Sequence, residues 1–572
     1  MWAALFYAPH ASAAATFTVT RTDDPVPNGC LPTDCSLREA VIAVNAGSGG
    51  DAIALPPGDY RLAISGIDSA GMKGDLNLTK SVTITGAGAR STVVDAVGLE
   101  RVFDVASGAV VLISDVTVTG AVGGAGISNS GTLTLVRDTI TGNQATGAGN
   151  GAGIASDGTL TITQSTISGN RAGDAGGGIA FTGSLTLTNS TVSGNSAGGT
   201  GGGIDAVGVA PTLRIGSSTI TGNQSFGGVT SAAGIYSVGS VTVENAIVAG
   251  NVAHESDQSA AAVTNCSAPV TSLGHNLSDT ADCGLAGAGD HQSVAALLGP
   301  LTDNGGSTDT RALLPGSPAR DAGANCPATD ERGVSRPRGV ACDIGAYEVA
   351  PPLATTAAAT GVTYGGATLN GTVDPSARET TAVFEYGPTT SYGSKVELGI
   401  AGSGVGSVPV SALLTGLRQG LTYHYRLVAT NAEGTTTGAD QTFTTLDKVK
   451  PVLSLLRVLP GLFHRAKGAK LNFRLSEPAT VTFRVDRVLR GVRRHGSCVV
   501  RSRRARGRAC TRYVPVPGSF AQAGAAGPNT FHFDARVGGR LLFPGAYRLR
   551  ASARDGAGNL GKTVVAAFRV LR

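Results

Sequence analysis

Three charged residues in the first third of the chain have the side-chain types that cleavage of an acidic polysaccharide would need. Asp115 and Asp138 would supply a pair of acids, and Arg137 would supply a cation for a negatively charged sugar. Glycoside hydrolysis needs two carboxylates about 5 to 9.5 Å apart on one face. Adjacent residues of a strand tend to point to opposite faces, so a surface salt bridge is the competing interpretation. We therefore assign no catalytic residue from the sequence and keep these three as candidates.

A second concentration of charge lies between residues 490 and 512. A disulfide between Cys498 and Cys510 would fold this segment into a basic hairpin that binds polyanions, such as envelope phosphates, acidic glycans, anionic lipids or extracellular DNA, by salt-sensitive charge contacts. Aromatic residues for base stacking are nearly absent, so we expect no specific nucleic-acid partner. A solvated basic loop is the alternative. The nine candidate residues are Arg490, Arg493, Arg494, Arg501, Arg503, Arg504, Arg506, Arg508 and Arg512.

Charge is divided unequally along the chain. Residues 447–572 hold 26 Lys and Arg against 5 Asp and Glu, a net charge of +21, whereas residues 1–446 hold 19 against 35, a net charge of −16. The overall charge of +5 therefore conceals two opposed regions. A strongly basic region indicates anionic partners, and we expect these to be polyanions or glycans of a cell envelope.

The eight cysteines fall into four close pairs with none left over: Cys30 and Cys35, Cys266 and Cys283, Cys326 and Cys342, Cys498 and Cys510. We expect disulfides formed in an oxidising compartment, although the sequence by itself leaves their connectivity open. Metal sites are the competing interpretation, but no CxxC spacing occurs and the chain has only 8 histidines. Five acids, Asp303, Asp309, Asp321, Asp330 and Asp343, have neither EF-hand nor repeat-type calcium spacing. We predict no metal and no cofactor.

The first residues resemble the end of a secretory signal. A short apolar run precedes Ala11, Ala13 and Ala15, which offer a small-residue cleavage site, although a basic segment before the run is missing. We interpret residues 1–15 as the remnant of a signal peptide. No later run of eighteen apolar residues occurs, so we expect no transmembrane segment. The predicted location is secreted, either extracellular or attached to the cell surface.

A repeat of about 25 residues occupies the region between these features. From Ile179 it is six residues to Leu185, two to Leu187, five to Val192 and three to Asn195. The same steps start at Ile127, Ile154, Ile235 and Val105, with Ala121 in place of the asparagine in the last of these, while the coil of Ile204 has three extra residues before Leu213. The segments alternate with period two and are bounded by glycine, a pattern typical of short strands. Three short strands cannot bury their apolar faces alone, so the units must stack.

Stacking the repeats in register assigns a role to the asparagines and tests for catalytic pairs. The asparagines recur at one turn position of the coil. This recurrence predicts a structural ladder, because asparagine tolerates the left-handed turn and its amide can bond to the next coil. An array of ligand-binding asparagines is the alternative. In another column, Asp115 lies over Arg137, followed by Gln164, Asn189, Ser217 and Asn245. No column holds acids in two adjacent coils. The ladder residues are Asn143, Asn170, Asn195, Asn223 and Asn251.

The repeats resemble right-handed parallel β-helix coils of the pectin-lyase-like type found in bacterial surface proteins. CSLREAVIAVNAG, residues 35–47, resembles the CSLREA segment that opens such proteins, and residues 299–323 with 331–348 resemble their choice-of-anchor closing segment. The resemblance implies a β-helix over residues 16–349, with a cap at each end. The N-terminal cap is expected to be a short amphipathic helix, because its apolar residues recur at helical spacing: Leu37, Ala40, Val41 and Val44.

Two further modules follow a linker of residues 350–354. Residues 355–446 resemble a fibronectin type III domain, with Leu417, Gly420 and Tyr423 in the tyrosine-corner region but Gln419 and Leu421 where Pro and Thr are usual. Residues 447–572 resemble a bacterial Ig-like domain and carry the basic segment.

We therefore predict an all-β protein, a right-handed parallel β-helix followed by two small β-sandwich domains, acting as a monomer. The expected function is that of a non-catalytic extracellular surface or matrix protein, in adhesion or envelope attachment, which binds polyanions through its C-terminal module. The alternative is a polysaccharide lyase or glycoside hydrolase acting on acidic polysaccharide, because most β-helices of known activity act on polysaccharides and fold alone does not decide activity.

Overall fold

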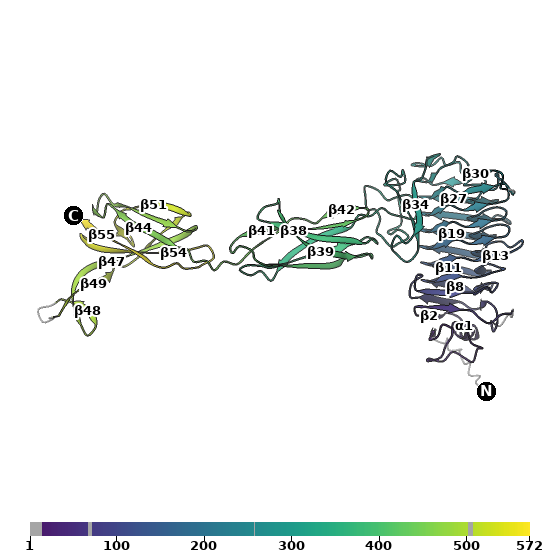
Figure 1. Cartoon of the computed structure of the whole chain (residues 1–572), viewed down its shortest axis with the longest axis horizontal. Helices are drawn as coiled ribbons and strands as arrows, with labels where there is room; N and C mark the ends of the chain where they lie inside the picture. The colour runs from purple at the N-terminus through teal and green to yellow at the C-terminus, as the bar shows by residue number, and fades with distance from the viewer. Residues whose placement is uncertain (1–13, 67–70, 257, 502–506) are drawn as a thin grey trace, which may run out of the picture.

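The computed structural model describes residues 14–66, 71–256, 258–501 and 507–572. It is an all-β architecture with a right-handed parallel β-helix followed by two antiparallel β-sandwiches, as predicted (Figure 1). Most of the predicted signal-peptide remnant, residues 1–15, lies outside the described residues. The solenoid, the first sandwich and the second sandwich follow one another along the longest axis of the molecule.

Each coil of the solenoid contributes one strand to each of several parallel sheets. The coil of residues 154–172 has β14 (Ile154–Ser156), β15 (Thr159–Thr163), β16 (Thr166–Ser168) and β17 (Arg171–Ala172). The two-residue fourth strand was not predicted: it forms because the chain remains extended after the Asn corner and pairs with the same segment of the next coil. We number the sheets I to IV by the position of their strands in the coil.

The strands of the four solenoid sheets have the following bounds. Sheet I contains β4 (Leu76–Leu78), β7 (Phe103–Val105), β10 (Ile127–Asn129), β14, β18 (Ile179–Phe181), β22 (Ile204–Ala206) and β26 (Ile235–Ser237). Sheet II contains β1 (Thr16–Thr18), β2 (Asp51–Leu55), β5 (Val82–Gly86), β8 (Val110–Ser114), β11 (Thr132–Val136), β15, β19 (Ser184–Thr188), β23 (Thr212–Gly216), β27 (Ser240–Glu244) and β31 (Thr271–Ser272). Sheet III contains β3 (Gly58–Arg61), β6 (Thr92–Asp95), β9 (Thr117–Thr119), β12 (Thr139–Thr141), β16, β20 (Thr191–Ser193), β24 (Thr219–Thr221), β28 (Ile247–Ala249), β32 (Leu277–Ser278) and β33 (His291–Gln292). Sheet IV contains β13 (Gln144–Ala145), β17, β21 (Ser196–Ala197), β25 (Gln224–Ser225), β29 (Val252–His254) and β30 (Ala261–Val263).

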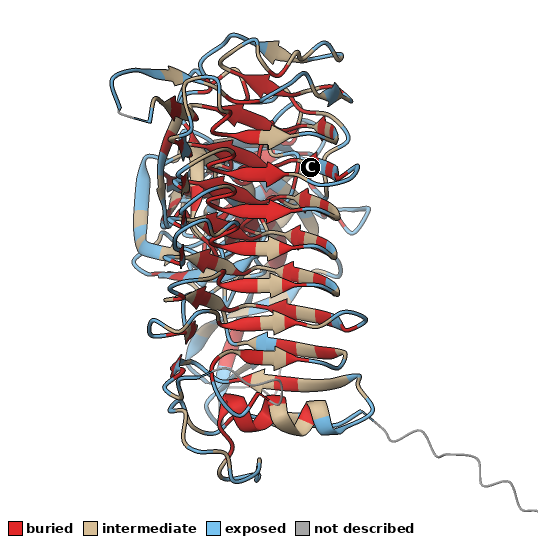
Figure 2. Ribbon diagram, turned by 90° about the vertical axis from the view of Figure 1, so that its right-hand side faces the viewer, coloured by how far each residue is buried: buried red, intermediate tan, exposed pale blue. Residues whose placement is uncertain are grey.

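The inner wall of the solenoid is built from the apolar residues of the repeat. Ile179, Leu185, Leu187 and Val192 are all buried, and each pairs with the residue at the same step of the neighbouring coils. Figure 2 shows these buried strand residues stacked in layers above the N-terminal helix. Burying one such side chain contributes about 1.5–3 kcal/mol relative to exposure, so the stack supplies the main stabilisation of the solenoid.

One predicted register is wrong. The repeat spacing aligned Val105 with Ile127, whereas β7 pairs Phe103 with Ile127 and Val105 with Asn129. The turn between β7 and β8 is two residues longer than in the next coil, and it closes through the Ala109 N–H to the Ala106 carbonyl. Phe103 is fully buried and occupies the inward position beside Ile127 that the repeat spacing had assigned to Val105.

The N-terminal end is covered by the predicted helix, α1 (Leu37–Ala46). Its first turn is fixed by a capping box between Ser36 and Glu39, and its apolar face is buried on the first coil. The sequence did not indicate the role of Arg38. Its side chain is fully buried and bonds to Asp24, with 2.8 Å between Arg38 Nε and Asp24 Oδ1, so an ion pair ties the N-terminal loop to the helix.

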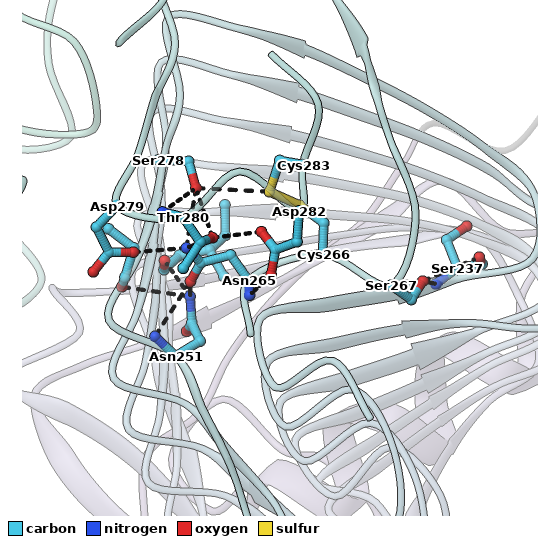
Figure 3. Close-up of a disulfide and its surroundings, with 12 residues drawn as sticks. Ser237, Asn251, Asn265, Cys266, Ser267, Ser278, Asp279, Thr280, Asp282 and Cys283 are labelled. Carbon is cyan, nitrogen blue, oxygen red and sulfur yellow. Dashed lines mark hydrogen bonds between the residues drawn. A yellow bond between two sulfur atoms is a disulfide. The ribbon is translucent and has the colours of Figure 1, made fainter. Parts of the chain in front are cut away.

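The asparagines form a continuous ladder of buried side chains. Each amide nitrogen donates to the Oδ1 of the next asparagine at 2.8–3.0 Å, from Asn143 to Asn251. The ladder continues to Asn265, 2.9 Å from Asn251, beside the Cys266–Cys283 disulfide (Figure 3). Asn265 follows Asn251 by only 14 positions, so the repeat period did not reveal it.

The two sandwiches begin with β36, which starts inside the segment expected to be a linker. The first sandwich packs β36 (Leu353–Thr360), β37 (Ala367–Asp374) and β40 (Val408–Leu414) against β38 (Thr380–Gly387), β39 (Ser394–Gly402), β41 (Thr422–Asn431), β42 (Gly434–Thr437) and β43 (Gln441–Thr444). Its Tyr423 hydroxyl accepts the Arg418 N–H at 3.0 Å. The second packs β44 (Leu453–Leu459), β46 (Ala469–Leu475) and β51 (Gly527–Phe533) against β45 (Leu462–His464), β47 (Ala479–Arg494), β48 (Ser497–Val500), β49 (Ala509–Pro515), β50 (Phe520–Gly524), β54 (Gly545–Arg554) and β55 (Val564–Leu571), with the small hairpin β52 (Arg536–Val537) and β53 (Arg540–Leu541).

The predicted disulfides are confirmed. Each close pair is joined, with S–S distances of 1.96–2.02 Å, and no described cysteine is free.

Asn195→Ala is expected to destabilise the solenoid by about 2–4 kcal/mol, because the buried Asn170 backbone N–H loses its acceptor and the bonds from the Asn195 amide nitrogen to the Ile167 carbonyl and to Asn223 Oδ1 are lost. Scanning calorimetry of the full chain would show a lower temperature for the solenoid transition. Thr186→Ala, on the outer face of β19, should change the stability by less than about 0.5 kcal/mol. Equal effects of the two changes would contradict a stabilising role for the ladder.

Candidate functional site

The three catalytic candidates lie at one corner of the solenoid but not on one face. Arg137 and Asp115 form a two-pronged ion pair on the outside, with Nε–Oδ1 and Nη2–Oδ2 distances of 2.7 and 2.5 Å. Asp138 is fully buried and accepts the N–H groups of Val116 and Val136. Burial raises the pKa of Asp138 well above its ordinary value, against the effect of these two N–H donors. The two carboxylates therefore do not face one substrate, because one points outward and the other into the wall.

The residues that stack on Asp115 in the later coils form a column at this corner, and several of them hold another segment of the chain in place. All six of its residues have φ between +46° and +62°, a left-handed turn that directs their side chains outward: Asp115, Arg137, Gln164, Asn189, Ser217 and Asn245. Three of these side chains hold the closing segment, residues 299–348. Gln164 donates to the Asp330 carbonyl at 3.0 Å, Asn189 to the Thr329 carbonyl at 2.8 Å and Asn245 to the Ala324 carbonyl at 2.6 Å.

The closing segment lies along the flank of the solenoid, not over its C-terminal end as a cap would. It begins with the hairpin of β34 (Leu298–Thr302) and β35 (Thr310–Leu313), and β34 lies beside the solenoid in Figure 1. The segment covers the outer face of sheet III, where its residues bond to the side chains of Thr166, Thr191, Ser193 and Thr219. For this reason β20, β24 and β28 are buried on both faces, whereas the outward residues of β12 are partly exposed. The end of the solenoid is closed instead by residues 264–292, where Cys266 and Cys283 join the apolar core.

Glu331 fastens the closing segment to sheet III. Its buried carboxyl lies 2.9 Å from the Thr166 hydroxyl, 2.5 Å from Thr191 and 3.1 Å from Thr308. Burial raises the pKa of Glu331 well above its ordinary value. The single hydroxyl hydrogen of Thr166 also faces the Asp309 carbonyl at 2.6 Å, so a protonated Glu331 satisfies both contacts.

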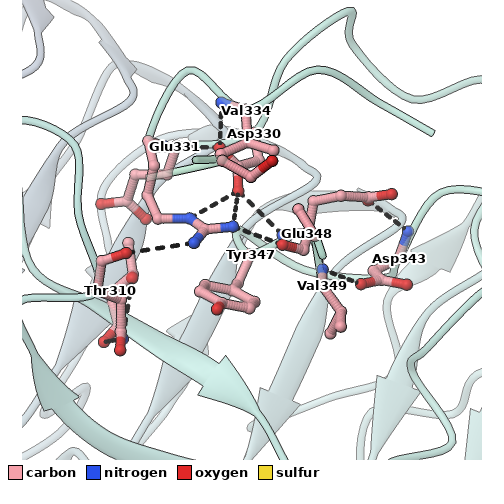
Figure 4. A network of polar contacts seen from close by, with 12 residues as sticks. Thr310, Asp330, Glu331, Val334, Asp343, Tyr347, Glu348 and Val349 are labelled. Carbon is pink, nitrogen blue, oxygen red and sulfur yellow. Dashed lines mark hydrogen bonds and ion pairs between the residues drawn. The ribbon is translucent and has the colours of Figure 1, made fainter. Parts of the chain in front are cut away.

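A second network lies within the closing segment (Figure 4) and reaches the first sandwich through Tyr347. Arg332 pairs with Asp330 at 2.7 Å, donates to the Glu348 carbonyl at 2.5 Å and lies 3.6 Å over the ring of Tyr347. The Tyr347 hydroxyl donates to Glu433 of the first sandwich at 2.9 Å. These contacts give the first sandwich a charged anchor on the flank of the solenoid.

The five acids considered for calcium are mostly engaged within the closing segment. Asp303 and Asp309 pair with Arg90 at 3.0 and 2.7 Å, and Asp330 pairs with Arg332. Asp343 accepts the Asp321 N–H at 2.7 Å, and Asp321 accepts the Ala341 N–H at 3.4 Å.

Among the residues that the structure describes, two groups have possible metal-ligand atoms within 4.8 Å of one another. In the group of Cys266, Asp282 and Cys283 the sulfurs are joined as a disulfide, so no thiolate is available. The other group, Asp447, Glu477 and Asp555, comes from the segment between the two sandwiches, residues 445–452, and from two turns of the second sandwich. These three acids were not predicted, because they are too far apart in the chain to form a motif. Asp555 already accepts two hydrogen bonds from Asn559.

The basic segment forms a three-stranded arm that extends beyond the second sandwich. β47 is its central strand, with β48 on one side and β49 on the other (Figure 1). The Cys498–Cys510 disulfide therefore joins the two outer strands and crosses β47 at Gly491. A Cβ on Gly491 would lie 2.7 Å from Cys498 Sγ, so this position requires glycine.

The arginines of the arm have no carboxylate partner among the residues that the structure describes. Arg490, Arg493, Arg494, Arg501 and Arg508 are exposed and Arg512 is half-buried. By contrast, Arg548 and Arg550 in the body of the sandwich pair with the buried Asp486 at 2.7 and 3.0 Å. The remaining candidates, Arg503, Arg504 and Arg506, lie outside the described residues. Six cationic groups are thus available to an external anion.

Comparison with known proteins supports the fold and leaves the activity open. Residues 102–286 match the family model of the right handed beta helix region. No curated protein matches the chain. No helix in the described part of the chain is long and apolar enough to cross a membrane.

Two solved structures are similar to parts of the chain. The sensor domain of the anti-sigma factor RsgI4 in Pseudobacteroides cellulosolvens is 20% identical, covers 17% of this chain and 98% of its own, and has a TM-score of 0.14. The FN1–FN3 domains of chicken CNTN1 are 11% identical, cover 39% of this chain and 67% of their own, and have a TM-score of 0.18. These scores are too low to carry an argument.

Glu331→Gln is expected to keep the closing segment in place, whereas Glu331→Ala should destabilise it by about 2–4 kcal/mol through unpaired hydroxyls. A folded-state pKa above the ordinary value of 4.5 means that the stabilising contribution of Glu331 is fully present below pH 4.5 and is lost as the pH rises from there through the folded-state pKa. Relative to Glu331→Gln, this loss should reach about 1.4 kcal/mol per pH unit, measured by denaturant unfolding. A difference between the two proteins that does not depend on pH would contradict a protonated Glu331.

Gly491→Val is expected to prevent the Cys498–Cys510 disulfide from forming, because the added side chain occupies the path of the sulfurs. Thiol titration of the unfolded, unreduced protein should detect two free thiols. Gly216→Val, on a strand with open space around its Cβ position, should leave none. If the Gly491→Val variant contained no free thiols, the Cys498–Cys510 disulfide would not depend on the space that Gly491 leaves open.

Proposed function

We propose that the protein is a non-catalytic extracellular surface or matrix protein whose C-terminal module attaches it to polyanions of a cell envelope or to acidic glycans. The observation that carries this proposal is the arm: six described arginines without carboxylate partners, on a module with a net charge of +21. Charge contacts of this kind are individually weak at an exposed site but add up along a polyanion and are sensitive to salt.

The solenoid supports this proposal as a scaffold. Its inner wall and its asparagine ladder are structural, and much of the outward polar corner is occupied by the closing segment. The four disulfides favour an oxidising location outside the cell. In this proposal residues 16–349 form the β-helix, residues 355–446 form a spacer of the fibronectin type III kind, and residues 447–572 form an Ig-like module that carries the arm.

The enzymatic alternative lacks a supporting observation at its candidate residues. Asp115 is neutralised by Arg137, and Asp138 is buried in the wall, so an acid pair does not face a common groove at this corner. Turnover of an acidic polysaccharide that is lost in Asp138→Asn would overturn the scaffold proposal.

The full chain with Arg490, Arg493 and Arg494 changed to serine is expected to bind heparin at least about tenfold more weakly at about 0.15 M salt, because three charge contacts are lost. The matched control changes Arg457, Arg474 and Arg484 to serine; these exposed arginines have the same total charge and lie on the body of the sandwich. Affinity chromatography over a salt gradient measures both. Unchanged binding by the arm variant, or equal losses in the two variants, would refute binding through the arm.

A further inference from the structure

One end of the second sandwich lies away from the segment that joins it to the first sandwich, residues 445–452. β44 starts at Leu453, next to this segment, and ends at Leu459, so the opposite, free end carries the turns that follow β44, β45 and β53. At this end, Leu459 lies opposite Lys470, and Gly545 lies opposite Val570, which pairs with Phe463. β47 pairs with β54 as far as Arg487 and Tyr547 and then continues beyond this end as the arm (Figure 1).

Large apolar side chains are exposed at this free end. Phe543, in the turn before β54, is 70% exposed, and Leu462 on the edge strand β45 is 52% exposed. Leu459 is 44% exposed and lines, with Leu462 and the buried Phe463, a groove of about 630 Å³. Single exposed apolar residues need no explanation, but several gathered at one end of a small domain indicate an interaction surface.

The polar residues of the same groove are all basic in type. Lys467, Lys470, His464 and His532 line it, and its described lining contains no carboxylate side chain. The acid in the neighbouring turn, Asp534, pairs with Arg536 at 3.8 Å. The exposed apolar side chains of this end, which we call the apolar tips (Leu459, Leu462 and Phe543), thus lie among basic side chains. The arginines of the arm project from the same end.

We propose that this free end docks on an anionic lipid surface. Phe543 and Leu462 enter the boundary between headgroups and acyl chains, while Lys467, Lys470 and the arm lie against the lipid phosphates. A soluble polyanion would satisfy the arginines but would leave the apolar tips in water, whereas a lipid surface takes up both. The inference rests on the proposed polyanion binding by the arm and names the class of partner.

The test uses the full chain and vesicles of phosphatidylcholine, with or without phosphatidylglycerol in equal amount. The wild type should sediment with the anionic vesicles and not with the neutral ones. Leu462→Ser with Phe543→Ser should weaken vesicle binding at least about tenfold, because two apolar side chains no longer leave water. The same variant should bind heparin as the wild type does. Leu413→Ser, at a site 70% exposed on the first sandwich, is the matched control and should bind the vesicles normally.

A second measurement reports insertion directly. Phe543→Trp should shift its fluorescence to shorter wavelength with anionic vesicles and should be quenched by brominated acyl chains, whereas Leu413→Trp should do neither. If the serine variant binds vesicles like the wild type and the indole of Phe543→Trp remains in water, lipid docking is wrong while heparin binding by the arm still stands. If the triple arginine variant retains its heparin affinity, the proposed function fails independently of the lipid result.

Discussion

Parallel hydrogen bonding between successive coils is the constraint on which the rest of the structure depends. Coils stacked about 4.8 Å apart must present the same kind of side chain at each position, because every residue lies directly over its counterpart. Apolar residues therefore line the inside, and asparagines form a ladder at one corner. In that ladder each side chain satisfies the backbone N–H of the preceding asparagine as well as its amide, as Asn195 does for Asn170. Removing water from such a corner is tolerable only when every polar group has a partner.

The same constraint explains why the solenoid needs its closing segment. Stacking leaves the outer face of sheet III with a row of threonines, serines and small apolar residues, and the closing segment buries much of this face. The left-handed corner residues that direct polar side chains outward supply its hydrogen-bond partners. A corner that could hold substrate in an enzyme is here partly used for internal packing. Glu331 and Arg332 then join the solenoid, the closing segment and, through Tyr347, the first sandwich.

The proposed function therefore lies in the C-terminal module. In the body of the second sandwich, the buried Asp486 neutralises Arg548 and Arg550, as a folded domain must when charge approaches its core. The described arginines of the arm have no such partner, and the disulfide across Gly491 holds the arm in a defined shape without burying its arginines. The separation of a negatively charged body from a positively charged tip is a property of the whole chain, and it favours one orientation on an anionic surface.

Local periodicity in the sequence determined the coils, their inward residues such as Ile179 and Leu185, the asparagine ladder from Asn143 to Asn251 and the N-terminal helix, and the even number of closely spaced cysteines predicted disulfides. These features repeat at short range or lie close in the chain, so their pattern is visible without a structure. Tertiary structure alone decided the inward direction of Asp138, the register of Phe103, the ion pair of Arg38, the continuation of the ladder to Asn265 and the position of the closing segment. The contacts of that segment join residues up to 219 positions apart and do not repeat. No period marks them, because they depend on where the chain returns to the solenoid after its last coil.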